Sequence, residues 1–195
     1  MITLTTDRLR LRPFTEVDLP AVLGIHRHPG IARFIPSAVC ATEDDARAAL
    51  TRFAGYDDGL LGIPAIELRD GPDAGQVVGL VMLKPIPPSG SQGAATATSP
   101  ALRPPAILPG PSEIWDIEIG WRAHPSHTGR GYIAEAARAV LAHALTHGLD
   151  RVVAVTDPEN LPSQRVAERI GMRRVGISRD YYDEVVVLFE ALRPA

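Results

Sequence analysis

The sequence predicts an α/β (α+β) fold built as one domain over residues 1–195. A chain of 195 residues with 45% hydrophobic content suffices for one core. Strand-like runs rich in β-branched or alternating apolar residues are interleaved with segments whose apolar residues recur at helical spacing. A loop with two glycines, at residues 127–131, leads directly into an alanine-rich helical segment. Together these features favour one compact domain and exclude disorder throughout.

Composition also limits the partners and the compartment that we expect. The net charge of −3 gives no electrostatic case for binding nucleic acid or a membrane surface. No stretch is long enough to span a bilayer, and the N-terminus lacks the apolar run of a signal peptide. The single cysteine, Cys40, is expected to be a small buried residue in a reducing compartment. We therefore expect a cytoplasmic protein, a monomer or homodimer, with no metal site.

The N-terminal half is predicted to contain two helices and three strands. Leu9, Leu11 and Phe14 alternate with arginines and indicate a first strand, after which Thr15 begins a helix. Thr42 is a plausible N-cap for a second helix that ends near Phe53, because three acids follow it. Two more strands are expected, separated by a turn rich in glycine and aspartate: Ile63–Leu68 and Val77–Leu83.

Between Pro85 and Pro111 the composition changes to proline, glycine, serine and alanine. Such a segment cannot bury enough apolar surface to offset the entropy lost on ordering it. We interpret residues 85–111 as a loop insertion between two neighbouring strands, and a lid over the acceptor site as the functional alternative.

The C-terminal half alternates strands and helices. A helix starts at Gly131 and is expected to end near Gly148, and Val166, Ala167 and Ile170 mark a further helix. Three strands are expected here: Ile114–Arg122, Arg151–Thr156 and Val185–Phe189.

The loop before the Gly131 helix has the features of a phosphate-binding site. Backbone N–H groups in the first turn of a helix lack intrahelical partners, the helix dipole adds positive potential, and glycine lets an anion approach closely. We therefore expect the loop to bind a ligand that contains a pyrophosphate. Residues Gly129–Ala134 also match the dinucleotide fingerprint G-x-G-x-x-A, with Asp157 further along the chain.

The context of the loop argues against a Rossmann dehydrogenase. A dinucleotide fingerprint follows a buried parallel strand without a gap, whereas the strand here carries Asp116 and Glu118 and is separated from the loop by Ala123–Ser126. Too little chain remains after Gly131 for a doubly wound sheet. Binding of a nicotinamide cofactor would instead support the Rossmann dehydrogenase.

The segments around the loop resemble the GNAT acyltransferases, in particular the RimJ/RimL-like branch of ribosomal-protein N-acetyltransferases. The order and spacing of the matching segments agree with that family up to about Gly176, and Leu4–Pro13 looks like its opening strand. The resemblance therefore covers most of the chain outside the insertion. The matching segments are Asp116–Trp121, Gly129–Ala136, Asp157–Ser163 and Arg169–Met172.

The resemblance implies a mixed, mostly antiparallel twisted sheet flanked by helices, with a V-shaped cleft for acetyl-CoA. In the family, loop amides hold the pyrophosphate, and the pantetheine arm hydrogen-bonds the splayed strand. Ser126 departs from the glutamine or arginine that many members have. The positions implied to bind the cofactor are Ile117, Ile119, His127, Thr128, Gly129, Arg130, Gly131, Tyr132, Ile133, Asn160 and Ser163.

Glu118 is the first candidate for the general base, acting directly or through water. Strand alternation places it on one face with Asp116, and two like charges that lie close together would raise one pKa. An ordinary polar strand face is the structural alternative. The match to the family's strand glutamate favours catalysis.

Asn160 and Ser163 are the other catalytic candidates that the resemblance implies. Asn160 would contact the cofactor or support catalysis, or would serve as the N-cap of the next helix. Ser163 would donate a proton to the thiolate or contact CoA. Many relatives have a tyrosine acid where this chain has Ala167. Tyr181 or Tyr182 from the following loop is a candidate substitute, and a packed or interfacial tyrosine is the structural alternative.

The sequence thus predicts an acetyl-CoA-dependent N-acetyltransferase that acetylates a primary amine directly in a ternary complex. The acceptor would be a protein or peptide N-terminus or a small-molecule amine. The alternative is a catalytically silent acetyl-CoA-binding regulatory module, because the usual tyrosine is missing.

Overall fold

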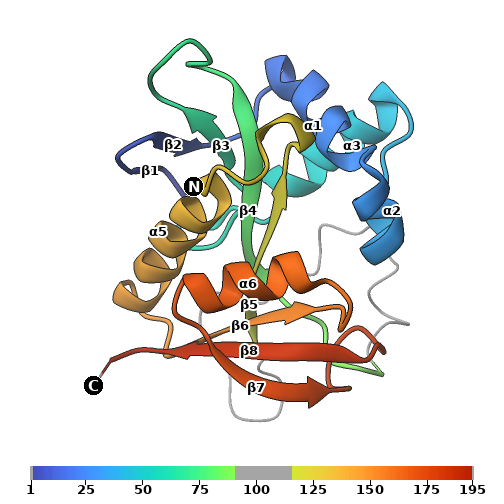
Figure 1. Ribbon diagram of the computed structural model, residues 1–195, viewed down its shortest axis with the longest axis vertical. Coiled ribbons are helices and arrows are strands. Elements are labelled where there is room, and N and C mark those ends of the chain that lie inside the picture. Colours follow the sequence, from blue (N-terminus) through green and yellow to red (C-terminus); the bar gives the residue numbers. More distant parts are fainter. Residues whose placement is uncertain (1, 91–115, 195) are drawn as a thin grey trace.

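The computed structural model describes residues 2–90 and 116–194. Its centre is one eight-stranded sheet with the order β1-β2-β3-β4-β5-β6-β8-β7 (Figure 1). All neighbouring strands are antiparallel except β5 and β6, which are parallel. The strands are β1 (Leu4–Thr5), β2 (Leu9–Arg12), β3 (Ala65–Leu68), β4 (Val77–Pro85), β5 (Ile117–Ala123), β6 (Arg151–Thr156), β7 (Arg173–Ser178) and β8 (Val186–Leu192). The expected mixed, mostly antiparallel sheet is confirmed.

Helices cover both faces of the sheet. Helices α5 and α6 pack on one face, where α5 contacts β4, β5 and β6, whereas α1 packs against α3 and β4 on the other face. The helices are η1 (Glu16–Asp18), α1 (Leu19–His26), α2 (Pro29–Phe34), η2 (Pro36–Ala38), α3 (Glu43–Ala54), η3 (Pro125–His127), α5 (Tyr132–Thr146) and α6 (Leu161–Arg169). No helix in the described residues combines the length and hydrophobicity needed to span a bilayer.

The core follows from the apolar periodicity of these elements. The larger cluster joins the α5 stripe, including Val140 and Leu141, to one face of the sheet that includes Ile119 and Phe189. A second cluster lies under α1 and α3. Cys40 belongs to it with 1% exposure, which confirms the expectation of a small buried residue.

Most predicted elements are confirmed, with small shifts at their ends. Thr42 caps α3 by accepting a hydrogen bond from Asp45 N, and β6 spans the predicted residues. The sequence analysis did not predict β7, because its residues are largely exposed and show no alternation. Most of the proposed insertion, from residue 91 to residue 111, lies outside the described residues, so neither interpretation of it is tested.

Candidate active site

The candidate site begins where β5 and β6 diverge. β5 pairs with β4 along its whole length, from Ile117 opposite Pro85 to Ala123 opposite Gly79. With β6 it shares one register pair, Glu118 with Val153 (Figure 1). Beyond Glu118, no described strand pairs with this edge of β5. Backbone N–H and C=O groups on such an edge are available to hydrogen-bond an extended ligand.

The glycine loop follows β5 and forms the start of α5. Gly129 and Gly131 have φ angles of 75° and 80°, in the left-handed region that glycine adopts without a steric penalty. Gly131 is the N-cap of α5 and offers no side-chain cap, so the first backbone N–H groups of the helix stay open to a ligand. A Cβ added at Gly129 would meet no atom within 4 Å. Conformation, not crowding, therefore requires glycine at this position.

These features fit the pyrophosphate of a CoA molecule. An anion at this end of a 15-residue helix interacts favourably with the helix dipole. His127 is buried beside the loop, and its Nδ1 has no hydrogen-bond partner in the described structure. The hydroxyl of Thr128 donates to the carbonyl of Pro125. Arg130, one of the positions that the resemblance implies for cofactor binding, lies 3.8 Å from the carboxylate of Asp73 and is half exposed.

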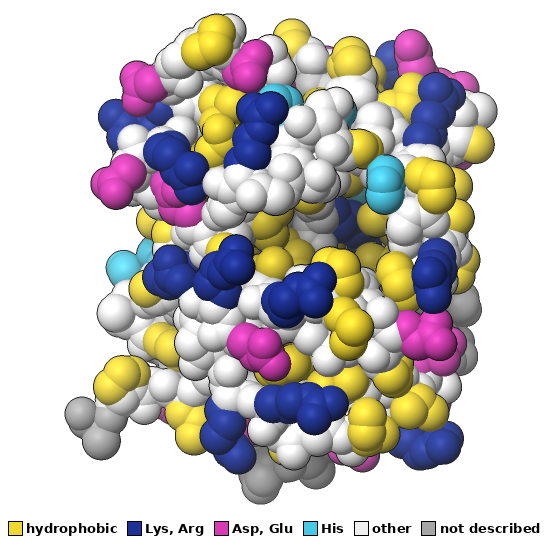
Figure 2. Space-filling model, viewed as in Figure 1, with side chains coloured by type: hydrophobic (Ala, Val, Ile, Leu, Met, Phe, Trp, Pro, Cys, Tyr) yellow, Lys and Arg dark blue, Asp and Glu magenta, His cyan; other side chains and the backbone are white. Residues whose placement is uncertain are grey.

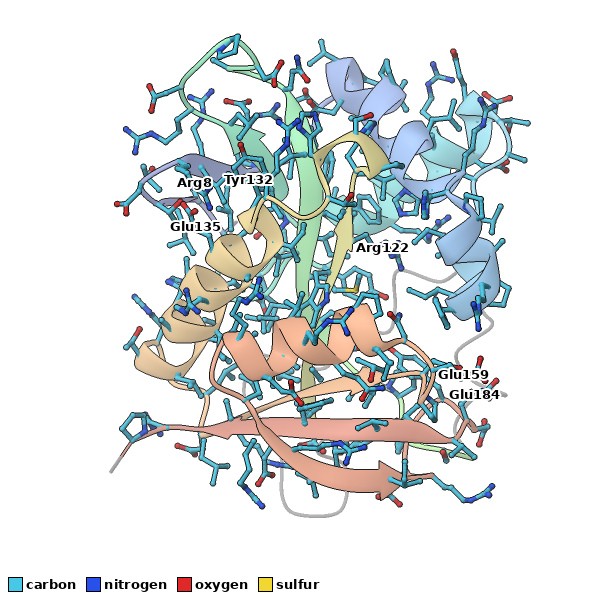
Figure 3. The ribbon with its side chains drawn as sticks, in the orientation of Figure 1. Arg8, Arg122, Tyr132, Glu135, Glu159 and Glu184 are labelled. Carbon is cyan, nitrogen blue, oxygen red and sulfur yellow. The ribbon has the colours of Figure 1, made fainter. Side chains whose placement is uncertain are left out.

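An ion pair between Arg8, in the turn that joins β1 to β2, and Glu135 holds the loop in place, and it was not predicted from the sequence. Glu135, in the first turn of α5, accepts hydrogen bonds from Thr6 Oγ1 at 2.6 Å and from Arg8 Nε at 2.7 Å. Arg8 also donates to the carbonyl of Arg130 and stacks over the ring of Tyr132 (Figure 3). Although burial opposes its charged form, these hydrogen bonds lower the pKa of Glu135. Arg8 therefore ties β1 and β2 to the phosphate-binding loop.

We expect Glu135→Gln to weaken acetyl-CoA binding by about fivefold to thirtyfold, because losing a charge-assisted hydrogen bond costs about 1–2 kcal/mol. Calorimetric titration with acetyl-CoA measures this change. Glu16→Gln is the control, since it removes an exposed ion pair with Arg47 at 3.4 Å. Equal acetyl-CoA affinity in Glu135→Gln and the wild type would show that the loop is rigid without this contact.

Glu118 lies at the point of divergence and is nearly buried, with 9% of its side chain exposed. Its Oε2 accepts a hydrogen bond from Lys84 Nζ at 2.9 Å and another from the Tyr182 hydroxyl at 2.6 Å. Lys84 also donates to the Tyr182 oxygen at 2.8 Å. The three groups form a closed, hydrogen-bonded triangle that orients the carboxylate on the sheet face opposite α5.

The contacts of this triangle change the acidity of two of its members. Burial opposes the charge on Lys84, but the Glu118 carboxylate and the Tyr182 hydroxyl together outweigh this effect and raise the pKa of the ammonium. Burial, followed by the charge of Glu118, raises the pKa of the Tyr182 phenol. Lys84 is therefore a cation and Tyr182 a neutral hydrogen-bond donor at neutral pH.

Tyr182 reaches the triangle from a turn between β7 and β8 with unusual backbone geometry. Tyr182 and Asp183 have φ angles of 59° and 57°, which non-glycine residues adopt at a cost of about 1–3 kcal/mol each. Two hydrogen bonds of Asp183 offset part of this backbone cost. Its carboxylate accepts from Gly90 N at 2.6 Å, and its N–H donates to Ser89 Oγ at 3.1 Å.

Asp116 and Glu118, which strand alternation places on one face, each have their own hydrogen-bond partners, and the expected effect of one charge on the other stays a prediction. Asp116 accepts a hydrogen bond from Arg151 Nη1 at 2.7 Å and another from the Tyr181 hydroxyl. Burial, together with the bond to Asp116, raises the pKa of Tyr181 to about 12.

Arg122 lies on the same strand face as Glu118 and is a further residue that the sequence analysis missed. Its Nη1 donates to His26 Nε2 on α1 at 2.6 Å. His26 Nδ1 lies 2.7 Å from the carbonyl of Val22, and because a carbonyl can only accept, Nδ1 carries the proton. Burial, with the charge of Arg122, lowers the pKa of His26 to about 4, so the imidazole is neutral.

The predicted residues after β6 lie at the start of α6. Asn160 is the N-cap of this helix, and its Oδ1 accepts from Ser163 N at 3.3 Å. This confirms the capping role of Asn160 and leaves its cofactor role as a prediction. Ser163 is partly buried one turn into the helix. Ala167 is fully buried in the core, so its position presents no group to the site.

Known proteins share both the sequence pattern and the geometry of this chain. A family model described as an acetyltransferase (GNAT) domain matches residues 8–173. The chain belongs to the GNAT acetyltransferase family. It is 32% identical to the uncharacterized N-acetyltransferase YnaD of Bacillus subtilis (strain 168), over 89% of this chain and 84% of YnaD.

Solved structures agree with this membership. A GNAT-family acetyltransferase from Bacillus anthracis superposes with a TM-score of 0.70 and 26% identity, covering 98% of this chain and 99% of that one. RimL, a ribosomal L7/L12 α-N-protein acetyltransferase in complex with coenzyme A, has the same fold, with a TM-score of 0.69 and 16% identity over 98% of each chain. The protein is thus a GNAT-type N-acetyltransferase whose cosubstrate is acetyl-CoA.

Proposed function

We propose that this acetyltransferase transfers the acetyl group directly to a primary amine in a ternary complex, with Glu118 as the general base. The supporting observation is the place of Glu118 at the one register pair between β5 and β6. A ligand that enters between the strands from the glycine loop would reach this carboxylate. The edge of β5 at Ile117 and Ile119, the loop from His127 to Ile133, and Asn160 and Ser163 would hold acetyl-CoA, which supplies an acetyl thioester.

In this proposal, Glu118 takes a proton from the acceptor amine, directly or through one water. Only the neutral amine has a lone pair with which to attack a thioester. Lys84 and Tyr182 are positioning residues, because their hydrogen bonds restrict the carboxylate to one orientation. The proton released by the nitrogen can return to the sulfur through solvent, so the reaction does not require a tyrosine at the position of Ala167.

The acidity of Tyr182 argues against its being the missing proton donor. A thiol has a pKa of about 8.5, whereas the pKa of Tyr182 is raised above the ordinary value of about 10 for a phenol. Proton transfer from this phenol to a thiolate would therefore run uphill. Its bond to Glu118 accounts for its place in the site.

We expect Tyr182→Phe to lower kcat/KM by about fivefold to twentyfold, because one hydrogen bond to a charged group contributes about 1–2 kcal/mol. Steady-state kinetics at saturating acetyl-CoA measure this loss. Tyr181→Phe is the matched control, since that hydroxyl donates to Asp116 instead. A loss of more than a thousandfold, with unchanged melting temperature, would instead assign proton transfer to Tyr182.

Direct transfer is favoured because the chain offers no suitable cysteine nucleophile. The single cysteine, Cys40, is 1% exposed, and burial raises the pKa of its thiol. A buried neutral thiol is a poor nucleophile. An acetyl-cysteine intermediate is therefore not part of the proposal.

The experiment that tests the proposal measures free-thiol release with acetyl-CoA and a panel of small amines and N-terminal peptides. We expect release that depends on one class of acceptor, with intersecting lines in double-reciprocal plots. Parallel lines would contradict direct transfer. Binding of acetyl-CoA without thiol release for any acceptor would support the silent regulatory module instead.

A further inference from the structure

Arg122 is a partly buried cation with no ion-paired or hydrogen-bonded acid among the described residues. It forms no ion pair there, and its one hydrogen bond joins Nη1 to His26, which is neutral. Burial lowers the pKa of the guanidinium, because it removes the charge from water, and the carboxylate of Glu118, which acts in the opposite direction, does not offset this effect. Buried charges in proteins are ordinarily paired, so this arrangement requires an explanation.

The unpaired edge of Arg122 has the geometry that binds a carboxylate. Nε is buried and has no hydrogen-bond partner, and Nη2 makes no hydrogen bond to any described residue. Nε–H and one Nη2–H are parallel donors on the same edge of the guanidinium plane, and this fork matches the two oxygens of a carboxylate. His26 holds the opposite nitrogen and so fixes the direction in which the fork points.

The two strands next to this site, β4 and β5, carry an excess of positive charge. The charged residues of β4 and β5 are Lys84, Glu118 and Arg122, which gives two cations and one carboxylate. Lys84 and Glu118 neutralise each other at 2.9 Å, so the charge of Arg122 remains. This excess positive charge on β4 and β5 disfavours polycationic acceptors and favours an acceptor that carries a negative group.

The surface around Arg122 gives a ligand a way in. Arg122 as a whole is partly exposed, and its side chain extends from β5 into the space below α1 and beside α2 (Figure 3). Figure 2 shows a hollow in the same face of the molecule, with a basic side chain at its back. The rim beside α2 carries both signs of charge, since Arg33 pairs with Glu159 at 2.8 Å and both side chains are exposed. Solvent screens such an exposed pair more than it screens Arg122.

We infer that Arg122 recognises a carboxylate on the acceptor, so that the preferred substrate is a primary amine that also carries an acidic group. This inference rests on the proposed function. Glu118 and Arg122 lie four residues apart on one strand face, which separates their Cα atoms by roughly 13 Å. Because both side chains are long, the Glu118 carboxylate and the Arg122 guanidinium can lie closer together than their Cα atoms. An acidic side chain near the N-terminus of a peptide meets this spacing better than the α-carboxylate of a free amino acid.

The test uses binding, so it does not depend on finding a substrate that turns over. Wild-type protein is first titrated with CoA, and the protein–CoA complex is then titrated with C-terminally amidated tripeptides. The tripeptides form matched pairs with aspartate or asparagine, and with glutamate or glutamine, at the second position. We expect the acidic member of at least one pair to bind tenfold or more tightly, as for a hydrogen-bonded charge pair.

Variants of Arg122 assign the preference to this residue. Arg122→Gln is expected to reduce the acid-to-amide ratio to about one with CoA affinity unchanged, and Arg122→Lys to leave an intermediate ratio. Arg174→Gln, on the exposed part of β7, is the control for losing one positive charge. If Arg122→Gln does not fold, the wild-type ratio and Arg122→Lys still decide the question.

The outcomes separate this inference from the function on which it rests. Failure to bind CoA contradicts the proposed function. CoA binding with equal affinity for acid and amide, including no detectable binding of either, contradicts the role of Arg122. A preference for the acid that persists in Arg122→Gln also overturns that role.

Discussion

Replacing Glu118 with glutamine will lower kcat by about a hundredfold to ten-thousandfold, the usual contribution of a general base. The affinity for acetyl-CoA should stay within about twofold of the wild type, because the proposed cofactor contacts use the loop and the β5 backbone. Rapid-quench or steady-state kinetics, together with calorimetry, separate these two effects. Wild-type kcat in a folded Glu118→Gln variant would exclude Glu118 as the base.

The ion pair with Lys84 complicates this variant, and a second substitution resolves the difficulty. Glu118→Gln leaves the nearly buried Lys84 ammonium without its carboxylate, and breaking a buried pair costs about 3–5 kcal/mol of stability. The double variant Glu118→Gln with Lys84→Met removes both charges and should recover most of the melting temperature. Its kcat should remain low. Recovery of stability and activity together would show that the single variant failed through misfolding.

Replacing Gly131 with aspartate should weaken acetyl-CoA binding by about a hundredfold, while the chemistry of any complex that forms is retained. The residue has φ of 80°, so any side chain strains the backbone, and a carboxylate at the start of α5 would repel the pyrophosphate. Calorimetric titration with acetyl-CoA measures the loss.

Gly148 provides the control, because it has φ of 117° and lies just after the other end of α5. Gly148→Ala should lower the melting temperature and leave acetyl-CoA affinity unchanged. Gly131→Ala separates strain from charge, since it introduces strain alone. Equal losses of acetyl-CoA binding in Gly131→Asp and Glu118→Gln would contradict the division between binding and catalysis.

The sequence alone predicted the elements that depend on local patterns. The β-branched run of β6, the capping residue Thr42 and the glycine loop at the start of α5 all follow from residue types at fixed spacing. β7 was missed because it is an edge strand whose exposed residues do not alternate. Local pattern carries little information about such a strand.

The partners within the site could not be predicted, because they depend on tertiary contacts. Lys84 lies opposite Glu118 through the β4–β5 register, and 34 residues separate the two in the chain. Arg122 and His26 are 96 residues apart. One compositional signal did point to Lys84. Lys84 is the single lysine in a chain with 20 lysines and arginines, and it directly follows the apolar run that was predicted as a strand.

The most direct test of the central claim is a single-turnover experiment on a preformed complex with acetyl-CoA. The complex is mixed rapidly with an amine acceptor, and the acceptor and the protein are analysed by mass spectrometry at successive times. Direct transfer predicts that the acetyl group appears on the acceptor amine at a rate that Glu118→Gln slows, and that the protein never carries it. An acetylated protein that forms and decays before the product appears would contradict the account.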